Sequence, residues 1–520
     1  MIKPIKTVFF FIVVGAFLAI SMLLLPKDGI QLLSFNIHMP TFDEMLSKDS
    51  VSYADISDIT KNIDNIDSLP DITKIIGESN IDSLKTDSSK SAIVEVAKDT
   101  FRANALVLAE NIHRIEFKNN NNSNLTKFFR KLHSARKKSI KIMHYGDSQI
   151  EGDRITSYIR NKLQKQYSGS GPGLLPALQP YGAYFSIDQK NTGNWKRYAI
   201  FGRRDTNVHH NKYGPLAAFS RFAPLWVDSL SNDTAIFNAS IIFKESKLAY
   251  SSVRNFQKIR ILYGNAQKPV NIKLFVDDQL ITESTLETNT TYSVFEYTLA
   301  TKTKNLKIDF SGQDSPDIYG IDLKSTTGVS VDNIGLRGSS GTIFRKINYE
   351  QLKLSYNDME TELFILQFGG NVMPYIKDTS QAVSYGRWFY NQLSTIKRTR
   401  PDASFIVIGP SDMSYKEGDK FVTYPFLEVV RDELKKAAFK AGYGYWDMYE
   451  AMGGYNSMPS WVNAEPKLAG ADYTHFTPRG AKLIGNMFYN ALMVESLSLK
   501  KQKKETKISD TTKSKNIKSK

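Results

Sequence analysis

Short apolar runs recur in two regions of the chain, and together they predict an α/β unit. Residues 140–145 form one such run with a single charge, which is typical of a strand that is buried on both faces. Further runs occupy residues 329–333, 363–368, 404–409 and 444–447, and expected helices occupy 158–167, 385–399, 425–441 and 478–497. Strands that alternate with helices in this way form a parallel sheet between helical layers.

The segment from about residue 180 to 328 follows a different pattern. Its apolar runs are short and are separated by turn residues, at 239–243, 258–263, 270–276, 293–298 and 305–310. A spacing of roughly a dozen positions between such runs is typical of a β-sandwich. Because the α/β pattern resumes afterwards, we predict that this sandwich is inserted within the α/β unit.

An apolar segment near the N-terminus predicts a membrane anchor. Residues 7–25 carry no charge, and this length is enough to cross a bilayer as a helix. Lys3 and Lys6 precede it, which predicts a cytoplasmic N-terminus and a periplasmic or extracytoplasmic location for the rest of the chain. The alternative is a cleaved signal peptide with a small-residue site at Ala19 and Ser21, although the apolar run continues beyond that site. We therefore expect a retained single-pass anchor.

Two polar segments are predicted to lie outside the folded parts. Much of residues 26–123 is rich in Ser, Asp, Lys and Asn, and the pentapeptide Asn-Ile-Asp-Ser-Leu occurs at 65–69 and 80–84. Such a composition cannot bury enough apolar surface to offset the entropy of ordering, so a disordered or partly helical stalk is expected. Residues 500–520 hold nine lysines against two acidic residues, which predicts a disordered basic tail.

Length, cysteine content and charge limit the remaining possibilities. A chain of 520 residues is long enough for two or three domains, and the absence of cysteine excludes disulfides and thiolate metal sites. The formal net charge is +15, but no basic helix with interleaved aromatic residues occurs, so nucleic acid is not an expected partner. The expected parts are an anchor (1–25), a stalk (26–123), an α/β domain (124–180 and 328–499), an inserted sandwich (181–327) and a tail (500–520).

Ser148 directly follows the first predicted strand of the α/β unit. The strand ends in Gly146-Asp147-Ser148, where glycine permits a sharp turn. In open α/β sheets this carboxyl edge is where ligands bind, so a serine here would lie at the mouth of a crevice. The tripeptide alone is weak evidence, because an ordinary Asp/Ser turn explains it equally well. Our hypothesis is that Ser148 is a nucleophile.

Three further motifs could assist a serine nucleophile. Gly338 would let a backbone N–H approach an oxyanion, although an ordinary glycine-rich turn is an equal alternative. The Asn371 amide could point at developing negative charge without titrating, or could simply cap a loop. Asp472 lies three residues before His475, so its carboxylate could accept from Nδ1 and leave Nε2 free to take the serine proton.

In their order along the chain, these motifs resemble those of the SGNH hydrolases, the GDSL-type esterase and lipase family. Four blocks of that family have counterparts here, namely Gly146-Asp147-Ser148, Gly338, Gly369-x-Asn371 and Asp472-x-x-His475. The resemblance covers residues 124–180 and 328–497 and implies a flavodoxin-like α/β/α fold. The family's third block usually continues with aspartate, whereas Val372 follows here, so whatever that aspartate supports must come from elsewhere.

The resemblance also implies a mechanism. Ser148 would attack an ester, His475 would act as general base, and Asp472 would orient the imidazolium. The N–H groups of Ser148 and Gly338 and the Asn371 side chain would form the oxyanion hole. This chemistry requires no cofactor and no metal.

A sandwich spliced between the first and second blocks is similar to that of membrane-anchored peptidoglycan O-acetylesterases, in which the insert resembles a carbohydrate-binding module. We therefore expect a serine esterase that removes O-acetyl groups from an envelope polysaccharide, with peptidoglycan as one candidate. Rings in the insert could stack on sugars or could form its core; these are Tyr181, Tyr184, Phe185, Trp195 and Tyr198.

Three alternatives use the same residues differently. An O-acetyltransferase would pass the acyl group from the same triad to a sugar, and nothing in the sequence separates it from an esterase. A non-catalytic glycan-binding protein on a hydrolase frame is disfavoured because every triad position is present. A lipid esterase or thioesterase is disfavoured by the polar loops around the motifs. The acyl group, the glycan and the oligomeric state stay undetermined by the sequence.

Overall fold

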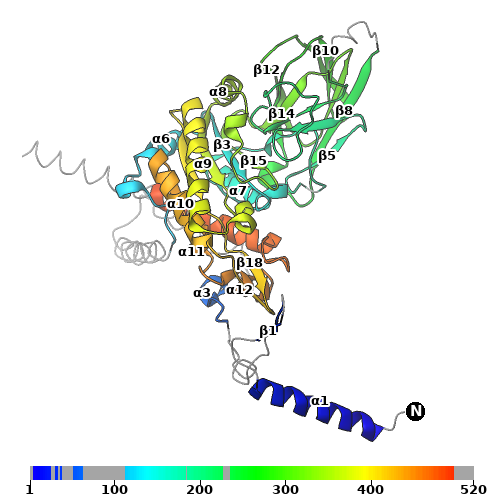
Figure 1. Cartoon of the computed structure of the whole chain (residues 1–520). Coiled ribbons are helices and arrows are strands. Elements are labelled where there is room, and N and C mark those ends of the chain that lie inside the picture. The colour runs from blue at the N-terminus through cyan, green and yellow to red at the C-terminus, as the bar shows by residue number, and fades with distance from the viewer. Residues whose placement is uncertain are drawn as a thin grey trace, which may run out of the picture. The chain divides into compact units, whose positions relative to one another are not determined.

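The computed structural model describes residues 4–24, 30–32, 35–37, 51–61, 112–182, 184–225 and 235–496, which fall into two compact units, Met1–Ser52 and Tyr53–Lys520. The first unit contains the helix α1 (Pro4–Leu24) and an antiparallel pair, β1 (Ile30–Leu32) and β2 (Phe35–Ile37) (Figure 1). Within the described residues, no helix is both long enough and apolar enough to cross a membrane.

A parallel sheet of five strands lies at the centre of the second unit. Its spatial order is β15 (Gly328–Gly335), β3 (Ser139–Gly146), β16 (Thr361–Gln367), β17 (Ser404–Ile408) and β20 (Gly444–Trp446). Numbered along the chain, these strands stand in the order 2-1-3-4-5, which is the flavodoxin-like arrangement. The predicted parallel sheet is therefore confirmed, and β3 and β16 flank the point at which the strand order reverses.

Helices cover both faces of this sheet. Side chains of β3 alternate between the faces, with Ile140 and Ile142 in one buried cluster and Met143 and Tyr145 in another. The first face packs against α6 (Ser123–Leu132), α7 (Thr156–Tyr167), α11 (Met448–Ala451), α12 (Ser457–Asn463) and the helix of residues 478–496. The second packs against α8 (Tyr349–Asp358), α9 (Thr379–Thr399) and α10 (Leu427–Ala441). Burial on both faces explains why these strands are apolar throughout.

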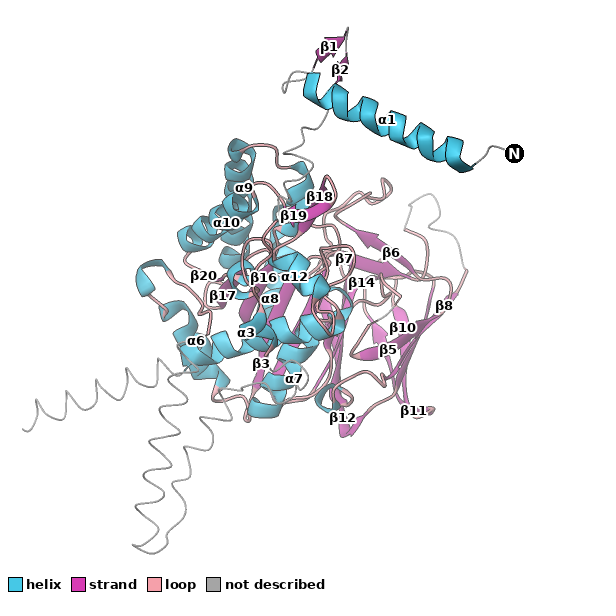
Figure 2. Cartoon of the chain, turned by 90° about the horizontal axis from the view of Figure 1, so that it is seen from below, coloured by secondary structure: helices cyan, strands magenta, loops and turns pink. Residues whose placement is uncertain are grey.

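Between α7 and β15 the chain forms two antiparallel sheets with their own core. One has the order β11-β10-β13-β8-β5, and the other has the order β12-β9-β14-β7-β6 with β4 paired to β14. The strands are β4 (Gly173–Leu175), β5 (Ile187–Asn191), β6 (Lys196–Ala199), β7 (Ala218–Arg221), β8 (Phe237–Glu245), β9 (Phe256–Gly264), β10 (Val270–Val276), β11 (Gln279–Leu286), β12 (Ser293–Thr303), β13 (Leu306–Gly312) and β14 (Asp317–Lys324). Figures 1 and 2 show this sandwich beside the helical layers.

A buried ion cluster joins the sandwich to the central sheet. Lys141 of β3 lies 2.8 Å from Asp322 of β14 and 2.8 Å from Asp332 of β15, and all three side chains are fully buried. Burial alone would lower the pKa of Lys141, but the two carboxylates raise it above its usual value. The ammonium therefore stays charged. Moving the sandwich away from the sheet would separate these opposite charges, which would cost free energy, so the cluster fixes the two parts together.

Part of the predicted stalk packs on the α/β layers instead. Ile115 and Phe117 are buried, and between them Glu116 exchanges backbone hydrogen bonds with Tyr445 of β20 at 2.7 and 2.9 Å. Ile56, just before α3 (Ser57–Thr60), is buried as well. The stalk prediction was wrong for these short pieces. An alternation of apolar and charged residues over only three positions, as in 115–117, is too brief to be recognised as a strand. Residues 62–111 and the predicted tail lie outside the described residues.

Candidate active site

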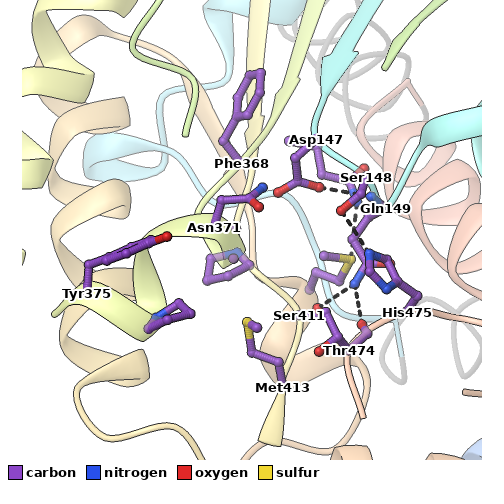
Figure 3. Close-up of a pocket in the computed structure, with 16 residues that line it drawn as sticks. Asp147, Ser148, Gln149, Phe368, Asn371, Tyr375, Ser411, Met413, Thr474 and His475 are labelled. Carbon is purple, nitrogen blue, oxygen red and sulfur yellow. Dashed lines mark hydrogen bonds between the residues drawn. The ribbon is translucent and has the colours of Figure 1, made fainter. Parts of the chain in front are cut away.

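Ser148 lies in the tight turn that follows β3, at the carboxyl edge of the sheet. Asp147 Oδ1 accepts the backbone N–H of Gln149 at 2.9 Å, and the Arg154 guanidinium donates to the Ser148 carbonyl. A side chain at Gly146 would meet Ile150 at 2.9 Å, so the turn needs glycine there for space. The turn leaves the Ser148 side chain half-buried, with its hydroxyl facing the loop that carries His475 (Figure 3).

A chain of two hydrogen bonds links Ser148 to His475 and Asp472. His475 Nε2 lies 2.8 Å from Ser148 Oγ, and His475 Nδ1 lies 2.7 Å from Asp472 Oδ2. Partial burial alone would raise the pKa of Asp472, but hydrogen bonds from the side chain and backbone of His475 hold it below its usual value. A charged Asp472 keeps the proton on Nδ1, which leaves Nε2 to accept from the serine.

Gln149 ties the serine turn to the histidine loop, a contact that the sequence reasoning missed. Its Nε2 donates to the Thr474 carbonyl at 2.6 Å and to Ser411 Oγ at 3.1 Å. Thr474 immediately precedes His475, so this amide fixes the loop that carries the imidazole. The one available signal was an amide side chain directly after Ser148, and its partner lies 325 positions away.

The two predicted oxyanion donors border the same hollow as Ser148 and His475. Gly338 follows β15 with a φ of +78°, and its N–H has no hydrogen-bond acceptor among the described residues. No atom lies within 4 Å of the place where a side chain would begin, so this position favours glycine for its backbone conformation. Asn371 lies in the short helix η8 (Gly370–Tyr375) after β16, where its Nδ2 donates to the Ser339 carbonyl at 3.2 Å.

The carboxyl group that approaches the Asn371 amide comes from Asp147. Burial raises the pKa of Asp147 to about 6, while hydrogen bonds from the Gln149 backbone and the Asn371 side chain, together with His475, oppose the rise. Figure 3 shows the Asn371 amide directed toward Asp147. The residue after Asn371 is Val372, so the carboxyl group beside this amide belongs to the serine turn and not to the position after Asn371.

Two hollows meet at Ser148, Asn371 and His475. The smaller has a volume of about 180 Å³ and is walled by α/β residues alone, among them Phe368, Pro374, Tyr375, Pro410 and Met413. The larger has a volume of about 700 Å³ and takes its wall from both parts of the unit. Glu151, Arg154, Arg337 and Gly338 come from the α/β part, and Tyr184, Phe185 and Leu248 come from the insert.

The aromatic residues expected to stack on sugars divide into two groups. Tyr184 and Phe185 line the larger hollow, and Tyr181 lies beside it with the Arg337 guanidinium 4.5 Å from its ring centre. Trp195 and Tyr198 are buried and pack against other rings, so these two belong to the core. Within the described residues, no group of three or more His, Asp or Glu side chains is placed to hold a metal ion.

Comparison with known proteins identifies the fold. The sequence matches no family model and no curated protein. A solved structure of a peptidoglycan O-acetylesterase aligns with 72% of this chain and 97% of its own, with a TM-score of 0.53 and 17% identity. This chain therefore shares the fold of that solved structure.

Shorter structures also match, including an acetyl xylan esterase from Geobacillus stearothermophilus (15% identity, 32% of this chain, 73% of that chain, TM-score 0.24). A GDSL-like lipase from Parabacteroides merdae is 15% identical and aligns with 32% of this chain and 74% of its own, with a TM-score of 0.26. These two scores are too low to support an argument. In this chain Ser148, Gly338 and Asn371 follow β3, β15 and β16, and His475 lies before the helix of residues 478–496. The structure therefore brings together residues from four distant segments.

Proposed function

We propose that the protein is a serine esterase that removes O-acetyl groups from an envelope polysaccharide. The observation that carries the proposal is the pair of hydrogen bonds that connects Asp472, His475 and Ser148 at 2.7 and 2.8 Å. A serine with a base at this distance, and a base oriented by a third group, is the arrangement that activates a nucleophile.

In the proposed reaction, Ser148 Oγ attacks the acetyl carbonyl carbon and its proton passes to His475 Nε2. The N–H groups of Ser148 and Gly338 and the Asn371 amide stabilise the tetrahedral oxyanion. Collapse of this intermediate expels the sugar oxygen, which takes the proton from His475 and leaves acetyl-Ser148. Water then attacks the acyl-enzyme with His475 as general base, and acetate leaves. Asp472 stabilises the imidazolium in both halves.

Two features favour a short acyl group on a large alcohol. The smaller hollow, about 180 Å³, suits an acyl group of few carbons, and the larger, about 700 Å³, suits a sugar chain. The similar solved structure is that of a peptidoglycan O-acetylesterase, so peptidoglycan is a candidate glycan. A predicted outward-facing anchor would place the domain near such a glycan.

Acetate release from O-acetylated peptidoglycan and O-acetylated xylan tests the proposal. We expect the wild-type chain to release acetate without an added acceptor, and Ser148→Ala to lower kcat by about 10⁶, as loss of a triad nucleophile does in other serine hydrolases. Transfer of acetyl only to an added sugar would identify a transferase. Release of long-chain acids but no acetate would identify a lipid esterase, and failure to label with a serine-directed fluorophosphonate would indicate a non-catalytic protein.

We also propose that the catalytic domain is extracytoplasmic and that residues 1–25 hold it at a membrane. The support is the uncharged run of residues 7–25 behind Lys3 and Lys6. Protease treatment of intact spheroplasts should digest the catalytic domain, and cell fractionation should place the full chain with membranes. A full chain that stays protected and soluble would contradict this.

A further inference from the structure

Arg197, on β6 of the insert, carries a guanidinium group that has no acidic partner in the part of the chain that the structure describes. Within the described residues it forms no ion pair, and its Nε is buried without a hydrogen-bond acceptor. Burial lowers the pKa of Arg197 below its usual value. The guanidinium is therefore partly removed from solvent, and no acidic side chain of the described residues pairs with it.

The three buried arginines of the described chain are all paired, whereas Arg197 is half-buried and it is its Nε that is removed from solvent. Arg160 lies 2.5 Å from Asp153, Arg221 lies 2.5 Å from Asp314, and Arg260 lies 2.8 Å from Asp358. A buried charge without a partner lowers stability, which is why such groups are normally neutralised. Arg197 departs from this rule, and a departure of this kind is expected where a ligand supplies the missing charge.

The surroundings of Arg197 connect it to the candidate active site. Arg197 lines a hollow of about 30 Å³ together with Gln179, Tyr181 and Tyr184. Tyr184 and Gly152 line both this hollow and the larger one beside Ser148. The volume is enough for the two oxygens of a carboxylate but not for a sugar ring, so a ring in the larger hollow could extend a carboxylate toward Arg197.

The neighbouring arginine is already neutralised. Arg337, which borders the larger hollow, pairs with Glu151, and its backbone N–H donates to the Tyr181 hydroxyl at 3.0 Å. Arg154, the other guanidinium in the wall of the larger hollow, is held by the backbone carbonyls of Ser148 and Glu151. Arg197, in the adjoining small hollow, has no ion pair among the described residues and its Nε has no acceptor there.

We propose that Arg197 binds a carboxylate of the glycan substrate, so that the enzyme favours acidic over neutral acetylated glycans. The proposal rests on the proposed esterase function and adds a binding site to it. A guanidinium binds a carboxylate through two parallel N–H···O bonds, a geometry that a lysine cannot reproduce. The carboxylate could belong to a uronic acid or to the lactyl or peptide part of peptidoglycan.

Arg197→Gln is the test, with Lys196→Gln as the matched control. Lys196 is the adjacent residue on β6, but its side chain is exposed and pairs with Asp205 at 2.9 Å. Acetate release is measured on acetylated polygalacturonate, acetylated peptidoglycan, acetylated neutral xylan and p-nitrophenyl acetate. We expect Arg197→Gln to lower kcat/KM on at least one acidic glycan by about 10- to 100-fold more than on xylan, mainly through KM, as expected for a lost charged contact. Whichever acidic glycan responds identifies the source of the carboxylate.

A structural role for Arg197 predicts a different result. It would lower the melting temperature and reduce activity on all four substrates equally, which would overturn the proposal. The binding role predicts an unchanged or higher melting temperature, because the substitution removes an unbalanced buried charge.

Calorimetry separates this proposal from the esterase function. Unacetylated trigalacturonate and muramyl dipeptide serve as acidic ligands and xylotriose as the neutral one. Tighter binding of an acidic ligand to the wild type than to Arg197→Gln would support the site even if no ester were hydrolysed. Equal binding by both proteins would refute the site and leave the esterase proposal intact.

Discussion

The α/β part and the inserted sandwich contribute to one site in different ways. Every member of the hydrogen-bonded chain from Asp472 to Ser148 comes from the α/β part, as do Gly338 and Asn371. The sandwich contributes no group within hydrogen-bond distance of Ser148 Oγ among the described residues, but it supplies part of the wall of the larger hollow. Under the proposed function, the reaction and the recognition of the alcohol would be carried by separate parts of the chain.

The strands of the two parts also differ in how much of each strand is buried. All seven residues of β16 are buried, whereas buried and exposed residues alternate along β10. A strand covered on both faces tolerates little change, while a strand with one open face tolerates substitution on that face. Loops between sandwich strands can thus vary the wall of the site without disturbing the sheet that positions Ser148.

Within this comparison of the two parts, the largest effect on kcat is expected at Asn371, which we assign to the reaction and not to recognition of the glycan. Asn371→Ala removes an amide that we expect to stabilise the oxyanion, so kcat should fall by about 10²–10³ on every ester with little change in KM. Val372→Ala is the control, because this neighbouring side chain packs in the core and lines neither hollow. Steady-state kinetics with p-nitrophenyl acetate measure both. Equal losses in the two variants would mean that the helix η8 is merely disturbed.

The junction between the two parts should be costly to break. Lys141→Met leaves Asp332 buried without its cation and Asp322 with only the longer 3.7 Å contact to Lys324, which should lower the free energy of unfolding by roughly 3–5 kcal/mol. Adding Asp322→Asn and Asp332→Asn should recover much of that loss. Lys127→Met is the control, since its ion pair with Asp402 is exposed and should contribute about 0–1 kcal/mol. Urea unfolding measures these values, and a loss below 1 kcal/mol for Lys141→Met would show that the cluster does not join the parts.

Two buried carboxyl groups should make the free energy of unfolding depend on pH in opposite directions. They are Asp147 in the serine turn and Asp322 at the junction of the sandwich and the sheet. Folding raises the pKa of Asp147 to about 6, so the wild type loses stability as pH rises from about 4 to 6. Asp147→Asn removes this loss and should gain roughly 3 kcal/mol relative to wild type above pH 7. Burial raises the pKa of Asp322, but Lys141 and Lys324 outweigh it and hold the value below the usual range. Asp322→Asn should therefore lose stability relative to wild type at neutral pH.

Unfolding midpoints measured from pH 4 to pH 8 compare the two variants with wild type. The Asp147→Asn curve should diverge upward from the wild-type curve as pH rises. Curves that run parallel for Asp147→Asn would contradict a raised pKa in the folded state.

The smallest effect is expected from the sandwich side of the larger hollow. Leu248 borders that hollow and is 68% exposed, so its contact with a bound glycan should be modest. Leu248→Ala should raise KM for the glycan by a few-fold, in line with about 0.8 kcal/mol per buried CH₂. Leu280→Ala alters a leucine of β11 that is 53% exposed and lines neither hollow, so KM should not change. A similar rise in KM in both variants would show that the sandwich does not take part in recognising the glycan.

Much of the α/β fold could be predicted because its strands are buried on both faces. An apolar run such as residues 363–368 is visible without knowing its partners, and β16 occupies Thr361–Gln367. The sandwich was harder to predict. Its strand β10 lies at Val270–Val276 as expected, but β5 reads Ile-Asp-Gln-Lys-Asn and becomes a strand only by pairing with β8.

The residues of the site also divide into those that could be recognised from the sequence and those that could not. The pair Asp472 and His475 was recognisable because its geometry is local, with the imidazole three positions after the carboxylate. Gln149, Leu248 and Arg197 could not be assigned, because the position of each is defined by segments far away in the chain. An amide, a leucine and an arginine are otherwise unremarkable residue types on loops and edge strands.

The position of the insert has a consequence for how the chain acquires its shape. Strand β3 pairs with β15 and β16, and Ser139 lies opposite Gly328, nearly two hundred residues later. During synthesis this apolar strand emerges first and finds no partner until the entire sandwich has been made. Long sequence separation of this kind slows folding and exposes unpaired edges to aggregation. A sandwich that folds quickly by itself would shorten the loop to be closed, so its own stability should set the yield of active protein.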